Sequence, residues 1–262
     1  MEALLSTAEA AHLAGVGTTS VKRWADEGLL PCQKTAGGHR RFARAAVERF
    51  LRELSPRAPT ERSDTWLDLL TAASTQHLHA ALLEARGRLG AWYLVCDELG
   101  PVFSRLGEQW ACGKVSVLQE HVASERIRRA LSFVSESLPV PTPSPTCLLA
   151  CAEGDEHTLG LALAELCLRE AGWSTLWAGR RTPATDIAEA VAQGEVEMVA
   201  LSASLAAPDN APLQRQLALI GEACERRHVP LVLGGNGAWP AQAGAAQRFT
   251  AFRTFAQWLK QD

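Results

Sequence analysis

Residues 147–161 read CLLACAEGDEHTLGL, and this stretch decides the fold of the C-terminal half of the chain. Its first six residues are apolar or small, which is typical of a short buried strand. The polar residues that follow predict a loop. Apolar residues at helical spacing come next and predict a helix over residues 158–171. The stretch therefore predicts a strand, a polar loop and a helix in succession.

Three further apolar runs repeat this pattern downstream. They cover residues 174–179, 198–204 and 229–235, and helical patterns lie between them over residues 185–193 and 212–226. Strands that alternate with helices form parallel sheets with helices on both faces. We expect a Rossmann-like, doubly wound α/β sensor domain over residues 147–262, with its ligand at the carboxyl ends of the strands.

The loop after the first strand carries Asp155, His157 and Gly160 in the spacing Asp-x-His-x-x-Gly. This motif resembles the DxHxxG loop of cobalamin-binding domains. The resemblance implies that His157 ligates cobalt from below and that Asp155 holds the other ring nitrogen, which fixes the tautomer. It also implies that Gly160 lets the nucleotide tail of the cofactor pass close to the backbone.

Two other strand ends contribute candidate cofactor-binding residues. Gly234 and Gly235 end the fourth strand, where the resembled family has a glycine pair against the buried cofactor tail. The third strand offers Ser202 and Ser204 in LSASL, although the family's Ser-x-Leu spacing is not kept. We expect adenosylcobalamin as the cofactor. The irregular third strand leaves open another tetrapyrrole, haem or biliverdin.

The middle of the chain has helical periodicity and almost no strand alternation. Helices are expected over residues 65–83, 91–106 and 115–136, and a four-helix bundle results if one of them breaks. Trp110, Glu120 and His121 resemble the tryptophan and Glu-His signature of the helical cap in CarH-type photoreceptors. The resemblance implies that these residues cover the upper face of the cofactor.

One residue departs from the photoreceptor pattern. The position after the cap tryptophan is a histidine in CarH-type proteins, where it takes the upper cobalt position after photolysis. Ala111 occupies it here. A bis-histidine photoproduct through this residue is therefore not available, and the sequence leaves open whether light is the signal.

The first 56 residues predict a helix–turn–helix. Ser6 and Glu9 match a capping box at the start of one helix. A second helix carries Thr19, Lys22 and Arg23, and TAGGHRRF predicts a hairpin with cations after its glycine tip. The segment resembles the MerR family, which implies a winged helix that reads a palindromic promoter as a dimer. The DNA-binding candidates are Thr19, Lys22, Arg23, His39, Arg40 and Arg41.

Composition supports this division of the chain. Residues 1–58 contain nine Lys/Arg and six Asp/Glu, whereas the whole chain has a net charge of −3, so a basic head precedes an acidic body. Two proline-rich stretches, residues 55–64 and 138–146, predict linkers. The seven cysteines are scattered without a CxxC pair, which favours reduced thiols over disulfides. No membrane span or secretory signal is expected.

We therefore expect a multi-domain cytoplasmic protein: a winged helix–turn–helix head over residues 1–56, a helical bundle cap over residues 62–137 and the sensor domain. The function expected is transcriptional repression controlled by cobalamin and, if the cap responds to it, by light. The partners are double-stranded promoter DNA and further copies of the chain, as a dimer or tetramer. No enzymatic activity and no membrane partner are expected. A corrinoid-binding methyl-transfer protein is the alternative from another class.

Overall fold

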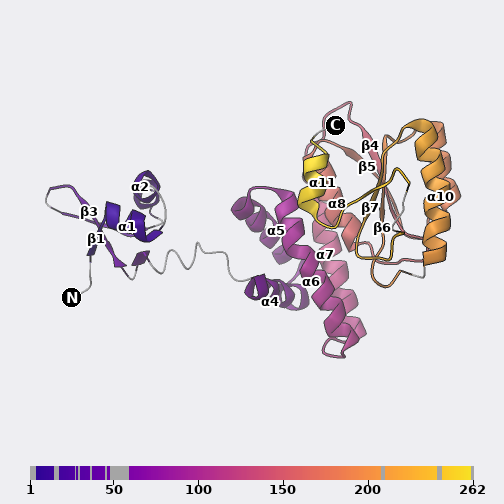
Figure 1. The fold of residues 1–262 in the computed structure, drawn as a ribbon. Helices are drawn as coiled ribbons and strands as arrows, with labels where there is room; N and C mark the ends of the chain where they lie inside the picture. Colours follow the sequence, from indigo (N-terminus) through magenta and orange to yellow (C-terminus); the bar gives the residue numbers. More distant parts are fainter. Residues whose placement is uncertain are drawn as a thin grey trace. The chain divides into compact units, whose positions relative to one another are not determined.

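The computed structural model describes residues 4–14, 18–26, 28, 30–35, 37–44, 46–47, 59–207, 210–240 and 244–260. The chain divides into two compact units, Met1–Arg62 and Ser63–Asp262 (Figure 1). Among the described helices, none combines the length and the apolar character that crossing a lipid bilayer requires.

The described part of the N-terminal unit packs helices α1 and α2 against a small antiparallel sheet. Its elements are β1 (Leu4–Ser6), α1 (Thr7–Ala14), α2 (Thr18–Asp26), β2 (Gln33–Lys34) and β3 (Arg40–Ala43), with strand order β1-β3-β2. The predicted capping box is present: Glu9 N–H donates to Ser6 Oγ at 3.2 Å, and Ser6 N–H donates to a Glu9 carboxylate oxygen at 2.7 Å. Val21, Leu30 and Phe42 form the centre of the core.

Four helices precede the sheet in the second unit. They are α4 (Pro59–Ala72), α5 (Thr75–Leu89), α6 (Trp92–Ala111) and α7 (Val117–Ser137). The break between α4 and α5 corrects the prediction of one helix over residues 65–83. Ser74 causes it, because its side chain accepts a hydrogen bond from His77 N–H and caps the start of α5.

The sheet of the second unit is parallel throughout, as the sequence predicts. Its strands are β4 (Thr146–Cys151), β5 (Ser174–Gly179), β6 (Met198–Ser202), β7 (Leu231–Gly234) and β8 (Gln247–Arg248), in the order β5-β4-β6-β7-β8. The helices are α8 (Leu159–Glu170), α9 (Ala184–Gln193), α10 (Asn210–Arg227) and α11 (Phe252–Trp258).

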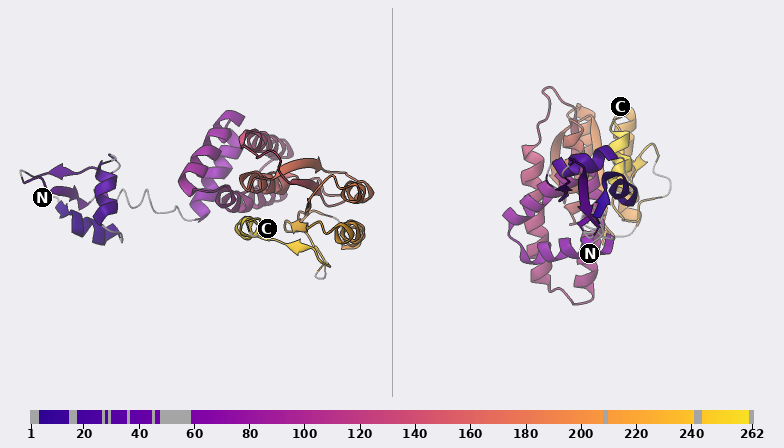
Figure 2. Two further views of the ribbon diagram at one scale, coloured as in Figure 1. Left: turned by 90° about the horizontal axis from the view of Figure 1, so that it is seen from above. Right: turned by 90° about the vertical axis from the view of Figure 1, so that its left-hand side faces the viewer.

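Alternate residues of β4 belong to two different cores, one on each face of the sheet. Leu149 and Cys151 pack with α8, α11 and the preceding helices, whereas Leu148 and Ala150 pack with α9 and α10. Figure 1 and Figure 2 show α10 on one face of the sheet and α8 with α11 on the other. Burial on both faces explains why β4 is continuously apolar in sequence.

Other predicted boundaries need correction. The third predicted strand, residues 198–204, ends at Ser202, so Ser204 lies in the loop beyond it. The sequence also predicts a last helix of the head, from about residue 43 to residue 54. Ala43 instead ends β3, and most of that stretch lies outside the described residues. The short elements β8 and α11 were not predicted. A two-residue strand has no measurable alternation, and a helix of seven residues gives only a weak periodic signal.

Candidate functional site

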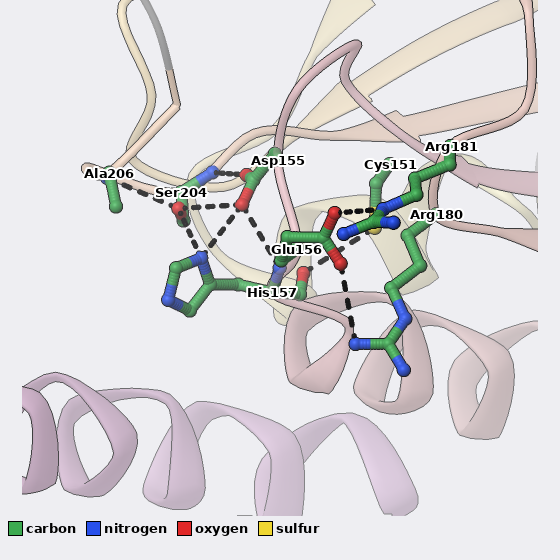
Figure 3. A network of polar contacts seen from close by, with 8 residues as sticks. All are labelled: Cys151, Asp155, Glu156, His157, Arg180, Arg181, Ser204 and Ala206. Atoms are coloured by element: carbon green, nitrogen blue, oxygen red, sulfur yellow. Dashed lines mark hydrogen bonds and ion pairs between the residues drawn. The ribbon is translucent and has the colours of Figure 1, made fainter. Parts of the chain in front are cut away.

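The loop after β4 brings Asp155 and His157 together at the carboxyl edge of the sheet (Figure 3). The carboxylate of Asp155 is buried, and its Oδ1 lies 2.8 Å from His157 Nδ1. The same oxygen accepts the backbone N–H of His157 at 3.0 Å. The aspartate thus holds both the backbone and the ring of the histidine two residues later. This is the arrangement that the motif predicts.

Ser204 completes this cluster from the loop after β6. Its backbone N–H donates to Asp155 Oδ2, and its hydroxyl lies 3.0 Å from Asp155 Oδ1 and 3.1 Å from His157 Nδ1. Figure 3 shows the serine and the imidazole side by side at the aspartate. The structure therefore places Ser204 among the predicted residues around His157. The contact joins two neighbouring strands, because β4 pairs with β6.

These contacts shift the protonation of both groups. Burial raises the pKa of Asp155, but hydrogen bonds from His157 and Ser204 outweigh it, so the pKa lies below its usual value. The hydrogen bond to Asp155 raises the pKa of His157 against the opposing effect of burial. Among the described residues none bonds the other ring nitrogen, Nε2, and the side chain is 62% exposed. An exposed imidazole nitrogen with its partner nitrogen fixed can accept a metal ion.

Glycines let neighbouring chain segments approach at this edge. A Cβ at Gly160 would lie 3.0 Å from Ser202 Oγ, and one at Gly235 would lie 2.2 Å from the carbonyl oxygen of Ala203. Gly235 also has φ of +81°. A Cβ at Gly234 would lie 3.9 Å from Leu201 O, an ordinary contact distance. The close contact with Ala203 is enough to explain why position 235 is a glycine. The predicted contact of Gly234 and Gly235 with a cofactor stays a prediction.

Helix α7 adds an acidic side chain near the histidine. The charge of Glu120 contributes to the raised pKa of His157, although less than Asp155 does. Ser124 Oγ donates to Glu120 at 2.6 Å. His121 Nδ1 lies 2.8 Å from Val117 O and 3.0 Å from Glu120, so this ring nitrogen is engaged within its own helix. The two predicted cap residues therefore differ: the charge of Glu120 acts on His157, whereas the ring of His121 bonds the backbone of its own helix.

Apolar side chains stand exposed in the same regions. Trp110, at the end of α6, is 47% exposed, and Val117 and Leu118 at the start of α7 are exposed as well. Leu205 is exposed in the loop that carries Ser204. Exposed apolar side chains that gather in one region are typical of a surface that a ligand or a partner covers.

An ion-pair cluster that the sequence analysis missed frames the loop. Glu156 bonds Arg181 Nε at 2.5 Å and lies 3.4 Å from Arg180 Nη1 (Figure 3). The arginines follow β5, and they meet Glu156 because β4 and β5 are neighbours. No local signal in the sequence connects charges that lie about 25 positions apart, so this contact could not be predicted.

The candidate DNA-binding residues lie on two elements of the N-terminal unit. Lys22 is exposed on α2, and His39 is exposed beside β3. Gly38, with φ of +79°, forms the hairpin tip, where its N–H donates to Thr35 O at 2.8 Å. The side chains of Thr19 and Arg23 lie outside the described part of the chain.

The two hairpin arginines differ in their surroundings. Arg40 pairs with Asp26 at the end of α2, whereas Arg41, half-buried, lies opposite Ser6 of β1. The hairpin thus presents cations, one of which is paired within the unit.

Models of known domain families match three segments of the chain. A helix-turn-helix domain model matches residues 4–55, and two B12 binding domain models match residues 62–134 and 145–253. The HTH-type transcriptional repressor CarH of Myxococcus xanthus is 26% identical over 272 residues, 89% of each chain. The repressor CarA of the same organism is 36% identical over 126 residues, 48% of this chain and 42% of CarA.

A solved structure supports the fold of the second unit. The Methanosarcina barkeri monomethylamine corrinoid protein matches with a TM-score of 0.58 and 18% identity, covering 78% of this chain and all of that one. The chain thus joins a helix-turn-helix domain to helical and parallel-sheet domains of the B12-binding type. The finer prediction of a MerR-type head stays a prediction.

Proposed function

We propose that this protein is a DNA-binding transcriptional repressor controlled by cobalamin held between α6–α7 and the carboxyl edge of the sheet. The observation that carries the proposal is the imidazole of His157, with Nδ1 bonded to Asp155 and Nε2 open. The similarity of the chain to the repressors CarH and CarA supports the regulatory role. The matches to B12 binding domain models support the choice of cofactor.

The residues present fit a corrinoid. His157 Nε2 would hold cobalt, while Asp155 and Ser204 keep the ring in one orientation. Trp110 and Glu120 would cover the opposite face of the corrin ring as part of a helical cap. Adenosylcobalamin would supply an upper ligand whose loss can serve as a signal. The glycines Gly160, Gly234 and Gly235 would lie along its tail together with Ser202.

The DNA-binding part would use a winged helix-turn-helix of the MerR type. Lys22 and Arg23 on α2 would read bases in the major groove, with Thr19 beside them. His39, Arg40 and Arg41 of the hairpin would contact phosphates. A dimer or tetramer would place two such heads on a palindromic promoter. The proposed domain limits are residues 1–56, 62–137 and 147–262.

Two alternatives differ in what they bind or do. In the first, the pocket of the same regulator takes haem or biliverdin, which Ala111 and the altered third strand leave open. In the second, the chain is a corrinoid carrier for methyl transfer, which the likeness of its second unit to a corrinoid protein favours. The helix-turn-helix match argues against the second, because a methyl carrier has no need of a DNA-binding head.

The experiment compares His157→Ala with His77→Ala, an exposed histidine of α5, in the full chain. Loss of the imidazole should greatly weaken adenosylcobalamin binding and change the absorption spectrum, while His77→Ala behaves as the parent protein. DNA binding without cofactor should be equal in all three. Equal cobalamin affinity and identical spectra in His157→Ala would refute the assigned role. Tight binding of haem or biliverdin without any cobalamin binding would favour the first alternative.

A further inference from the structure

A cavity of about 300 Å³ lies at the carboxyl edge of the sheet, on the face that α9 and α10 cover. Glu153 from the loop after β4 lines it, together with residues 183–185 at the start of α9 and with Arg215, Gln216 and Leu219 of α10. None of the candidate cobalamin-binding residues lines this cavity. Helix α8, which follows His157, covers the opposite face.

Gln216 is among the residues that line the cavity, and its amide is only half satisfied. The residue is 1% exposed, and its Oε1 accepts the backbone N–H of Glu153 at 2.9 Å. Because Oε1 faces this donor, the orientation of the amide is set and Nε2 carries the hydrogens. Nε2 is buried and has no hydrogen-bond partner among the described residues. A buried N–H group without an acceptor is unfavourable, so a ligand oxygen that reached Nε2 from the cavity would be stabilised.

The start of α9 supplies further donors. The helix runs over ten residues, and Pro183 at its N-cap provides no side-chain cap. Within the described part of the chain, the N–H groups of Ala184 and Thr185 donate to no backbone acceptor. The first N–H groups of a helix point out of its end and favour negative charge.

The charged side chains at the cavity set the charge of a ligand. Arg215 is exposed and forms no ion pair with a described residue. Its guanidinium can bind two oxygens of one ligand group. Glu153 places one carboxylate at the same cavity, and this charge opposes a second negative charge on the ligand.

From these observations we infer that the cavity binds a small oxyanion, a carboxylate in preference to a phosphate dianion. Arg215 and the amide nitrogen of Gln216 bind its oxygens, together with the first N–H groups of α9, while Leu219 contacts an apolar remainder. The ligand would also contact the loop that continues to Asp155 and His157, because Glu153 of that loop lines the cavity.

The test uses the full chain without added cobalamin, so its outcome does not depend on the proposed repressor function. Sodium acetate and sodium phosphate are titrated by calorimetry at constant ionic strength. We expect saturable binding with a preference for acetate. Arg215→Ala should raise the dissociation constant about tenfold or more, because a charge-assisted pair is lost. Arg226→Ala, an exposed arginine of the same helix, is the matched control and should bind as the parent protein does.

Two further variants test the roles of Gln216 and Glu153. Gln216→Glu keeps an acceptor for the N–H of Glu153 but replaces the donor with an anion, so oxyanion binding should be lost in the folded protein. Glu153→Gln should improve phosphate binding more than acetate binding. Absence of saturable binding by either anion, or equal binding by the Arg215→Ala and Arg226→Ala proteins, would overturn the inference. An unchanged preference in Glu153→Gln would overturn the choice of carboxylate.

Discussion

At the scale of single residues, the candidate site depends on one buried carboxylate. Asp155 accepts hydrogen bonds from His157 and from Ser204, and it stays ionised because these bonds outweigh the cost of its burial. The hydrogen bond to this carboxylate, and to a smaller extent its negative charge, raises the pKa of His157. The two groups therefore titrate as partners, and changing either should be visible in the other.

The first prediction concerns this pair in the cofactor-free protein. Asp155→Asn should lower the pKa of His157 toward the ordinary value of about 6.5. Since the folded pKa is raised, the pair stabilises the protein below about pH 6.5, and this contribution is lost as the pH rises through the folded pKa. An NMR titration of the His157 ring measures the shift. A pKa unchanged in Asp155→Asn would show that the carboxylate does not control the imidazole.

The second prediction concerns Ala111, the last residue of α6. Its side chain has no donor atom, whereas a histidine there would present an imidazole next to Trp110. In protein loaded with adenosylcobalamin and illuminated, Ala111→His should therefore give an absorption spectrum with two nitrogen ligands, which the parent protein lacks. Identical spectra for the two proteins would mean that position 111 does not face cobalt.

At the scale of elements, the carboxyl ends of β6 and β7 are locked together by close backbone contact. Gly235 has a positive φ, and a side chain there would meet the carbonyl oxygen of Ala203. Gly237 donates its N–H to the same carbonyl at 2.8 Å. Trp239 Nε1 donates to Gly234 O at 2.8 Å and closes the turn. The loop that holds Ser204 is thus fixed by its neighbour.

The third prediction separates backbone strain from crowding at these strand ends. Gly90, at the end of α5, also has positive φ but has open space around it, so Gly90→Ala should cost about 1 kcal/mol of unfolding free energy from strain alone. Gly235→Ala adds the clash with Ala203 and should cost about 3 kcal/mol or more. Urea unfolding followed by circular dichroism measures both. Equal losses would argue against the close approach.

The hairpin of the N-terminal unit leads to the fourth prediction. Arg40→Ala should weaken binding to all duplex sequences and reduce the salt slope of log K by about one, because one phosphate contact is lost. Asp26→Asn, which removes the ion-pair partner of Arg40, should strengthen binding or leave it unchanged. Fluorescence anisotropy at several salt concentrations measures both. An Arg40→Ala effect confined to one DNA sequence would instead indicate base reading.

At the scale of the whole molecule, the proposed function requires that the cofactor and DNA influence each other. A ligand shifts an equilibrium only by its difference in affinity for the two states. Oligomerisation is the proposed link, since further copies of the chain would bring heads together on a palindrome.

The fifth prediction follows from thermodynamic linkage. If adenosylcobalamin changes the affinity for promoter DNA by some factor, within about 5–150-fold, the DNA must change the affinity for adenosylcobalamin by the same factor. Titrations of each ligand in the presence and absence of the other measure the two factors. DNA affinity that is indifferent to adenosylcobalamin would contradict cofactor control while leaving both binding activities in place.

The sequence by itself determined the elements whose signals are local. The apolar run of β4, the Asp155–His157 loop and the helix after it were readable because residues close in sequence form them. The same holds for the Ser6–Glu9 capping box and for the hairpin tip at Gly38. The bond from Asp155 to His157 spans only two residues, and the resemblance of this loop to the DxHxxG motif implied it.

Only the tertiary structure decided which strands are neighbours, and the remaining contacts of the site follow from that. Ser204 contacts Asp155, 49 positions away, because β6 lies beside β4. The arginines after β5 contact Glu156 because β5 lies on the other side of β4. The cavity lined by Gln216 is likewise formed by three segments that lie far apart in sequence: the loop after β4, the start of α9 and part of α10. Strand order in a parallel sheet is set by how helices pack on its faces, and no local pattern of the sequence records it.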